Sequence, residues 1–260
     1  MGLVRPKETA TTFRAGFDRT AVPDALLPMG NGLHAPIYDV SKLRSCRDPR
    51  ARRATLLAAT RRGMAREGYS GVTLRMVAAE CQTTTQTVYN LIGGRRRLLA
   101  EAIADHGREI LQRVPQARHQ SFRILDLIDS LWKSAALYPE YMAQASLGYA
   151  DLHGDPTGTI YRASIGFVQI CLSDVRPVLR DSIDQTVLAE AMNSAIVTAL
   201  YEWARQSVGL ESLQLNLFMR SGLLLLGAIP PREAPVLEQW LEQYCKRTRP
   251  QPLPPVPAFE

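Results

Sequence analysis

Two short helical patterns joined by a polar break, within residues 73–97, constrain the fold of this chain more than any other segment. In the first pattern apolar residues recur at helical spacing, at Leu74, Val77, Ala78 and Cys81. In the second, an apolar face of Val88, Leu91 and Ile92 lies opposite a polar face of Thr85, Gln86, Tyr89 and Asn90. An apolar back packs on a scaffold while a polar front reaches base edges in a major groove. The two patterns predict a helix-turn-helix.

Basic residues are concentrated around these two patterns. Residues 42–97 hold 13 basic residues against 3 acidic ones, a net charge of +10 in a chain whose total is +6, so the remainder carries −4. Arg95, Arg96 and Arg97 follow the second pattern directly, where a phosphate strand would run. A basic module on a mildly acidic body is typical of a DNA reader with a separate sensing or assembly domain. A generic arginine-rich surface is the alternative interpretation.

The rest of the chain is also helical by pattern, and no segment alternates at period two. We therefore predict an all-α fold, with a three-helix helix-turn-helix domain followed by a larger helical domain. Besides the two short helices, a first helix begins at Asp48-Pro49 and ends at Gly68, and Ser182 with Gln185 fits a capping box. The further predicted helices are 95–114, 121–138, 139–152, 157–180, 183–208, 211–227 and 234–247.

These patterns divide the chain into four parts. Residues 1–46, rich in Pro, Gly, Thr and Arg, are predicted to form an extended or disordered arm. The DNA-binding domain is expected over residues 47–97 and the effector-binding and dimerisation domain over residues 98–248. Residues 249–260 form a Pro-rich tail with polyproline character.

Composition argues against several other classes of protein. The four cysteines are far apart, without a CxxC pair, and the four histidines are scattered, so we expect neither a disulfide framework nor a metal site. There is no phosphate-binding glycine loop or nucleophile motif, so we expect no cofactor and no enzymatic activity. The longest apolar stretch, residues 213–229, contains Gln214, Asn216 and Arg220, which argues against a membrane span. With no targeting segment visible, a cytoplasmic location is predicted.

Residues 52–101 resemble the TetR family of bacterial transcriptional regulators. The matching residues, in order, are Ala58-Ala59, Gly68-Tyr69, Thr73, Val77-Ala78, Thr87-Val88-Tyr89 and Leu98-Leu99. The chain departs from the family pattern in the turn, where Gln82 and Thr83 replace the usual glycine and apolar residue. It departs again at Ile92, in place of an aromatic residue, and at Arg95-Arg96, in place of a lysine-glutamate pair. Glutamine adopts the left-handed backbone of such a turn only at a cost on the order of 1 kcal/mol.

The resemblance implies a role in DNA binding for ten residues. They are Arg52, Arg53, Thr73, Arg75, Thr84, Thr85, Gln86, Tyr89, Asn90 and Arg95. Arg75 is the candidate for a bidentate contact to guanine, Gln86 for a contact to adenine, and Arg95 for the phosphate contact of the usual lysine. Two alternatives remain open at this point. Thr83 and Gln86 also fit a capping box, and Tyr89 also fits packing against the first helix.

The resemblance further implies a homodimer that binds a palindromic operator and responds to a small effector. The predicted dimer interface consists of two apolar helix faces, one with Met192, Ile196, Ala199 and Trp203 and the other with Phe218, Met219, Leu223 and Leu226. The alternative is that both faces pack inside the core of a single subunit. The predicted ligand pocket consists of Trp132, Tyr138, Met142, Tyr149, Tyr161 and Phe167, which favours a largely apolar ligand. The expected function is a ligand-responsive repressor. The alternative is a regulator-derived helical protein that acts through protein contacts.

Overall fold

The structure is a computed structural model of the whole chain, and it describes residues 48–114, 122–152, 158–173 and 175–247. The N-terminal arm predicted over residues 1–46 and the Pro-rich tail predicted over residues 249–260 lie outside the described residues. The division of the chain into four parts therefore stays a prediction.

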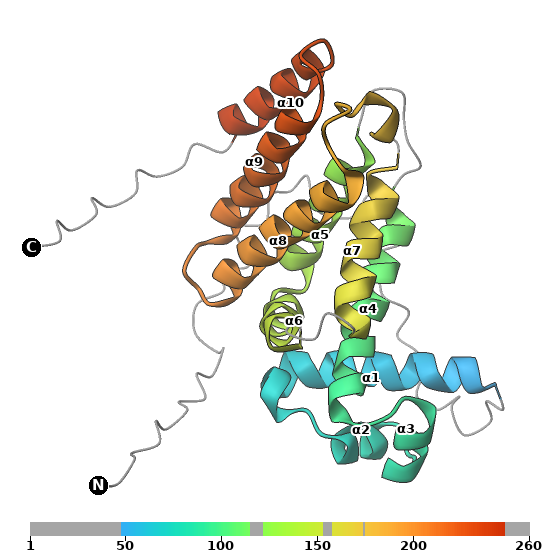
Figure 1. Cartoon of the computed structure of the whole chain (residues 1–260). Coiled ribbons are helices and arrows are strands. Elements are labelled where there is room, and N and C mark those ends of the chain that lie inside the picture. The colour runs from blue at the N-terminus through green and yellow to red at the C-terminus, as the bar shows by residue number, and fades with distance from the viewer. Residues whose placement is uncertain (1–47, 115–121, 153–157, 174, 248–260) are drawn as a thin grey trace, which may run out of the picture. The chain divides into compact units, whose positions relative to one another are not determined.

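The described part of the chain is built from α-helices with one short 3-10 helix and contains no strand, so the predicted all-α fold is confirmed (Figure 1). The elements are α1 (Pro49–Gly71), α2 (Leu74–Glu80), α3 (Thr85–Leu91), α4 (Arg95–Arg113), α5 (Arg123–Leu137), α6 (Pro139–Leu152), α7 (Thr159–Cys171), η4 (Arg176–Val178), α8 (Gln185–Ala204), α9 (Leu210–Ala228) and α10 (Ala234–Arg247). None of these helices is both long and apolar enough to span a bilayer.

The first three helices pack on one another and on the start of α4. As the sequence predicts, α1 begins with Asp48 as its N-cap, whose carboxylate accepts a hydrogen bond from the backbone N–H of Arg50 at 2.9 Å, and with Pro49 at the first helical position. Gly68 kinks the helix with a φ of 75° instead of ending it, and helical backbone resumes as far as Gly71. We call α1 to α3 the reading head.

The turn between α2 and α3 is regular despite its lack of glycine. Gln82 adopts the left-handed backbone, with a φ of 51°. Its N–H donates to Ala79 O at 3.1 Å, while the N–H of Thr83 donates to Ala78 O at 2.9 Å. This pair of bonds is the Schellman arrangement that ends many helices. The departure from the family pattern therefore leaves the turn geometry intact, at the energetic cost expected of a left-handed glutamine.

Two predicted helix boundaries are wrong, each for a local reason. The helix predicted over residues 157–180 ends at Cys171, and Pro177, which lacks an N–H, then lies in the short η4 turn. The capping box predicted for Ser182 and Gln185 does not form. Instead Asp184 is the N-cap of α8, and its carboxylate accepts from the N–H groups of Thr186 at 2.7 Å and Val187 at 3.1 Å.

The body of the protein is arranged around α6 (Figure 1). This helix packs against α1 of the reading head and also against α4, α5 and α8. The long pair α8 and α9 pack on each other, α10 packs on α9, and α7 lies between α4 and α8. Movement of α6 or α4 would therefore displace side chains both in the body and in α1 of the reading head.

The left-handed glutamine gives a testable prediction for stability. Gln82→Gly should raise the free energy of unfolding by about 0.5–1 kcal/mol, because the relief of backbone strain exceeds the added entropy of the unfolded chain. Urea denaturation measures this change. As a control, Gln239→Gly in the exposed face of α10 should lower stability, because glycine weakens a helix interior. Equal destabilisation by both substitutions would contradict the account of the turn.

Candidate nucleic-acid interface

The exposed face of α3 presents four polar or aromatic side chains to solvent. Val88 and Ile92 are buried on the opposite side of the helix and fix its orientation. The exposed side chains are Thr85, Gln86, Tyr89 and Asn90. Tyr89 is 59% exposed, which excludes the alternative that it packs against α1. The face has the composition and exposure that contacts to base edges require.

Hydrogen bonds within α3 decide between the two interpretations of Gln86. The N-cap of α3 is Thr84, whose hydroxyl oxygen accepts from the N–H of Thr87 at 3.1 Å. Gln86 takes no part in this cap, so the capping box proposed for Thr83 and Gln86 is not formed. Instead Gln86 Nε2 donates to Asn90 Oδ1 at 2.8 Å. The two amides thus orient each other on the exposed face, with Gln86 Oε1 and the Asn90 amine available to base edges.

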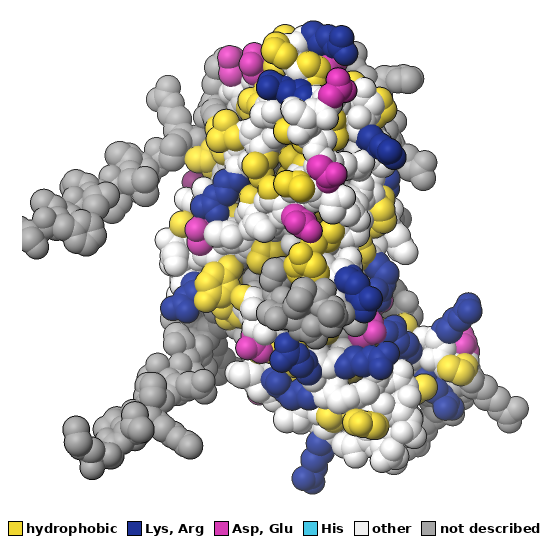
Figure 2. Space-filling view, viewed as in Figure 1, with side chains coloured by type: hydrophobic (Ala, Val, Ile, Leu, Met, Phe, Trp, Pro, Cys, Tyr) yellow, Lys and Arg dark blue, Asp and Glu magenta, His cyan; other side chains and the backbone are white. Residues whose placement is uncertain are grey.

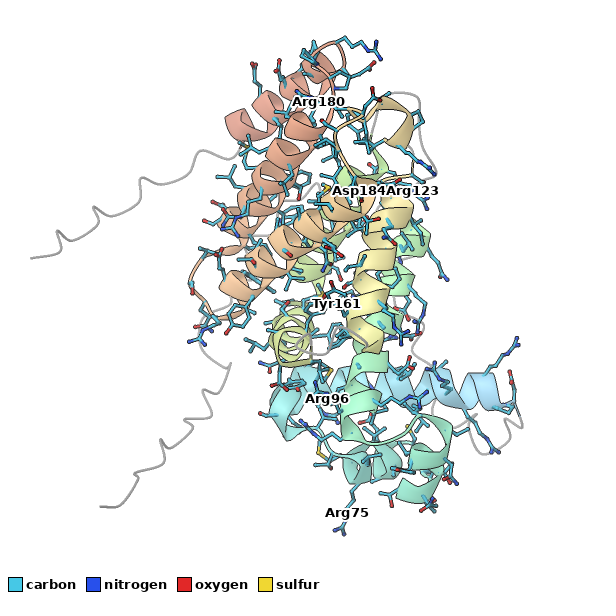
Figure 3. All side chains as sticks on the ribbon, viewed as in Figure 1. Arg75, Arg96, Arg123, Tyr161, Arg180 and Asp184 are labelled. Atoms are coloured by element: carbon cyan, nitrogen blue, oxygen red, sulfur yellow. The ribbon has the colours of Figure 1, made fainter. Side chains whose placement is uncertain are left out.

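Two predicted contact residues of α2 are also exposed. Thr73 is the N-cap of α2, and its Oγ1 accepts from the N–H of Met76 at 3.2 Å, which leaves the hydroxyl proton available for a phosphate. Arg75 extends away from α2 into solvent (Figure 3). Among the described residues, neither Arg75 nor Arg96 has an acidic partner within salt-bridge distance, so both guanidinium groups can bind DNA without breaking an ion pair.

Arg95 has a structural role that the sequence did not reveal. Its Nε donates to Val72 O at 2.7 Å, and its Nη2 donates to Tyr69 O at 2.7 Å and to Ser70 O at 3.0 Å. Its guanidinium also lies 5.4 Å from the centre of the Tyr69 ring. Arg95 therefore satisfies backbone carbonyls at the end of α1. The phosphate contact predicted for it would fall to Nη1, the nitrogen that these bonds leave over.

Other arginines of the head are held by carboxylates. Arg53, predicted to support DNA binding, lies 2.8 Å from Glu101. Arg62 and Arg66 both pair with Glu80, at 2.7 and 2.8 Å. Burial raises the pKa of Glu80, but these two arginines outweigh it and hold that pKa below its usual value. The positive charge available to phosphates is therefore smaller than the count of arginines suggests. Basic side chains are still prominent around the reading head (Figure 2).

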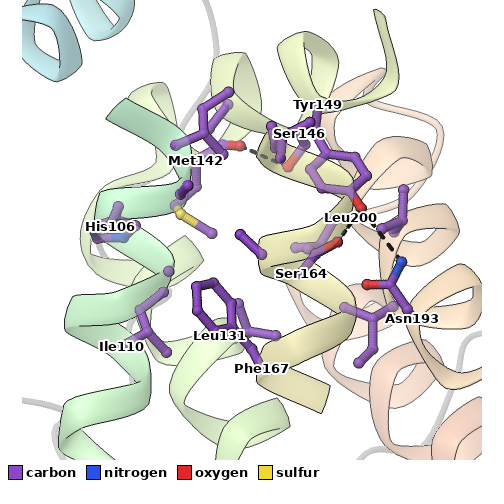
Figure 4. Close-up of a pocket in the computed structure, with 18 of the residues that line it drawn as sticks. His106, Ile110, Leu131, Met142, Ser146, Tyr149, Ser164, Phe167, Asn193 and Leu200 are labelled. Atoms are coloured by element: carbon purple, nitrogen blue, oxygen red, sulfur yellow. Dashed lines mark hydrogen bonds between the residues drawn. The ribbon is translucent and has the colours of Figure 1, made fainter. Parts of the chain in front are cut away.

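A cavity of about 130 Å³ lies in the body and is lined by residues of α4 to α8 (Figure 4). Three residues of the predicted pocket, Met142, Tyr149 and Phe167, line it. The other three, Trp132, Tyr138 and Tyr161, are not among its lining residues. Sequence reasoning missed Asn193, Ser164 and His106, because small polar residues on a helix face give no periodic signal.

The predicted dimer residues separate into two groups. Met192, Ile196, Ala199, Trp203 and Phe218 are buried in the core of the subunit itself. Met219 and Leu226 are partly exposed and Leu223 is 59% exposed, on the outer side of α9. Any partner surface must therefore rely on the second group, because the first is already covered within one chain.

These features define a helix-turn-helix domain followed by a larger helical body, and comparisons with known proteins agree. The family described as bacterial regulatory proteins, tetR family, matches residues 56–102. Residues 56–102 therefore carry the DNA-binding domain of the TetR family, in the segment where the sequence resemblance predicted it. No curated protein sequence matches it.

Several solved structures share the fold. A TetR-family transcriptional regulator from Pectobacterium atrosepticum is 21% identical with a TM-score of 0.51, and the match covers 70% of this chain and 95% of that one. The TetR regulator TylP from Streptomyces fradiae is 16% identical with a TM-score of 0.50, over 76% and 98%. The fatty acid degradation regulator FadR from Bacillus halodurans is 12% identical with a TM-score of 0.51, over 67% and 94%.

The exposure of Arg75 gives a prediction for DNA recognition. Arg75→Ala should relax the preference for the best-bound sequence by about 1–3 kcal/mol, because a bidentate arginine contact discriminates between bases. Arg96→Ala is the matched control and should weaken binding to all sequences about equally, as the loss of a phosphate contact does. Competition titrations with specific and random duplexes at fixed salt measure both effects. Identical behaviour of the two variants would show that Arg75 does not read bases.

Proposed function

We propose that this protein is a ligand-responsive transcriptional repressor that binds a palindromic operator as a homodimer and is released by a small, largely apolar ligand. The observation that carries the proposal is the exposed polar face of α3 beside Arg75. In a protein of this family, such a face is suited to a major groove and to little else.

A homodimer follows from the size of the reading head. One helix-turn-helix covers only a half-site, so specific binding normally requires two heads related by the symmetry of a palindrome. The outer face of α9 offers a surface for pairing, because Met219, Leu223 and Leu226 recur at helical spacing and remain partly or largely exposed. Val187 of α8 is also 64% exposed. Figure 2 shows apolar side chains on the face over α8 and α9.

The helix α6 connects the cavity to the reading head. Met142, Ser146 and Tyr149 of α6 line the cavity. Between these positions, Gln144 Oε1 accepts from the N–H of Tyr69 at 2.8 Å, and Gly148 lies under the Tyr69 ring. A Cβ at position 148 would lie 2.4 Å from Tyr69 Cδ2, so only glycine permits this approach. A shift of α6 would therefore displace the end of α1.

A second connection runs through α4. His106 lines the cavity, and its Nδ1 lies 3.5 Å from Glu109 Oε2. Glu109 in turn accepts a hydrogen bond at 2.8 Å from Arg61 of α1. A ligand that favours a different position of α4 or α6 thus changes the position of α1, which packs against both helices. The mechanism is a population shift toward a dimer whose two heads no longer match the half-site spacing.

Selection of bound duplexes from a random DNA pool, at roughly physiological salt, tests this proposal. Enrichment of a palindrome with half-sites about one helical turn apart is the expected result. The absence of an enriched sequence, together with DNA binding that vanishes as the salt concentration rises, would contradict the proposed function. That outcome would favour the second candidate, a regulator-derived protein that acts through protein contacts, since only nonspecific phosphate binding would remain.

The exposed face of α9 gives a prediction for assembly. Leu223→Glu should convert the dimer to a monomer, because a charge would be buried without a partner at the interface. Light scattering after size-exclusion chromatography measures the mass in solution. Ile170→Glu is the matched control, since Ile170 is 45% exposed on α7 and should tolerate the charge. A wild-type monomer, or a Leu223→Glu dimer, would refute this surface as the interface.

A further inference from the structure

The wall of the cavity is mainly apolar, and at one place in it hydrogen-bonding side chains from three helices form a cluster. Tyr149 of α6, Ser164 of α7 and Asn193 of α8 meet at one side of it (Figure 4). The hydroxyl oxygens of Tyr149 and Ser164 lie 2.5 Å apart, and Asn193 Nδ2 lies 3.4 Å from the Tyr149 hydroxyl. Asn193 is only 4% exposed. An amide atom of Asn193 that makes no hydrogen bond must therefore face the cavity or the protein interior.

The direction of each hydrogen bond in this cluster follows from counting protons. Ser164 donates its single hydroxyl proton to the backbone carbonyl of Tyr161 at 2.9 Å. In the contact between the two hydroxyls, Ser164 must therefore be the acceptor and Tyr149 the donor. This bond uses the only hydroxyl proton of Tyr149. The Tyr149 oxygen then accepts, so Asn193 must direct its amine toward Tyr149. This assigns the orientation of the Asn193 amide independently of how its O and N atoms were placed.

The orientation of Asn193 leaves its carbonyl oxygen as a hydrogen-bond acceptor. Oδ1 has no hydrogen-bond partner among the described residues. In the close-up it points away from Tyr149, toward the space between the helices (Figure 4). A ligand that donates a hydrogen bond can pair with this acceptor, whereas a ligand without a donor would cover it and leave it without a partner, which costs free energy.

The cavity offers no compensation for a charged ligand. Among the residues that the structure describes, those that line the cavity include no Lys, Arg, Asp or Glu. His106 is the one lining residue that titrates near neutral pH. Burial is the main cause that holds the pKa of His106 below its usual value, so its ring is neutral at pH 7. Two other hydroxyl side chains belong to the wall: Ser146 donates to the backbone carbonyl of Met142 at 2.7 Å, and the buried Tyr141 hydroxyl has no hydrogen-bond partner among the described residues. A carboxylate or an ammonium group would therefore be desolvated without a counter-charge.

We propose that the cavity binds an uncharged, largely apolar molecule that donates a hydrogen bond, as an alcohol does, to Asn193 Oδ1. This inference deepens the proposed function and rests on it, since it names the chemical class of the effector. It also identifies Asn193 as the residue that selects for a hydrogen-bond donor, with Tyr149 and Ser164 holding its amide in place.

Four probes of similar size test the chemical class. They are 1-octanol, its isomer heptyl methyl ether, octanoate and octylammonium, each titrated into the full-length protein at pH 7 without DNA by calorimetry. The alcohol should bind about threefold to tenfold more tightly than the ether, which cannot donate a hydrogen bond. The two ions should bind more weakly than either. Equal binding of alcohol and ether, tighter binding of an ion, or no binding of any probe would overturn the proposal.

Three variants test the role of Asn193. Asn193→Leu should bind alcohol and ether equally. Tyr149→Phe removes the acceptor that orients the amide, so the Asn193 amine can turn to the cavity and ether binding should improve relative to the alcohol. Ser130→Ala is the matched control and should keep the wild-type ratio, because the Ser130 hydroxyl donates to the backbone carbonyl of Asp126 within α5 and does not line the cavity. Thermal melting establishes that each variant is folded. An unchanged ratio in both folded Asn193→Leu and folded Tyr149→Phe would overturn the assignment.

The two proposals fail in different experiments. Probe binding is measured without DNA, whereas the regulatory function is tested by selection of duplexes. Probe binding in the predicted order without an enriched palindrome would refute the regulator and keep the ligand class. An enriched palindrome without probe binding would refute the ligand class and keep the regulator.

Discussion

A buried guanidinium joins α1 of the reading head to the body of the protein. The Arg61 side chain of α1 is only 13% exposed and lies 2.9 Å from Asp105 and 2.8 Å from Glu109, both on α4. Tyr141 of α6 is fully packed beside the same group. Removal of one partner of a buried ion pair typically costs about 3–5 kcal/mol, because the remaining charge stays desolvated. The helices α1, α4 and α6 therefore meet at the charge of Arg61, and separating any of them from it would cost free energy.

The same junction is the route by which a ligand in the cavity would influence DNA binding under the proposed function. The residues that hold α1 belong to α4 and α6, and these two helices also supply part of the cavity wall. Tyr69 adds a second attachment at the far end of α1, where its hydroxyl bonds to Asp151 and its ring packs on Gly148. Arg95 then fixes the carbonyls of the same segment. Side chains from two cavity-lining helices, α4 and α6, thus hold α1 near its middle and at its end.

Much of the fold could be predicted from the sequence, because helical periodicity is a local signal. The bounds of α6 and α10 agree with the prediction, and Asp48-Pro49 marked the start of α1. Errors occurred where a local feature competes with the pattern, as at Pro177 and at the Asp184 cap. The exposed face of α3 was also predictable, since Val88 and Ile92 fix which side is buried.

The candidate sites were harder to predict, because they depend on partners distant in sequence. Arg95 reaches carbonyls more than 20 residues away, and nothing local distinguishes it from Arg96. Met192 and Leu223 both lie on apolar stripes of long helices, yet one is core and the other is surface. Asn193 appears ordinary in the sequence. It becomes informative only when Tyr149 and Ser164, from two other helices, are placed beside it.

The proposed function requires that α3 reads base edges in the major groove, once from each subunit of a dimer. A structure of the protein bound to its selected duplex tests this claim most directly. The account predicts two α3 helices in successive major grooves about 34 Å apart, with Gln86, Asn90 and Arg75 at base edges. A complex in which α3 faces solvent, or in which a single subunit contacts only phosphates, would contradict it.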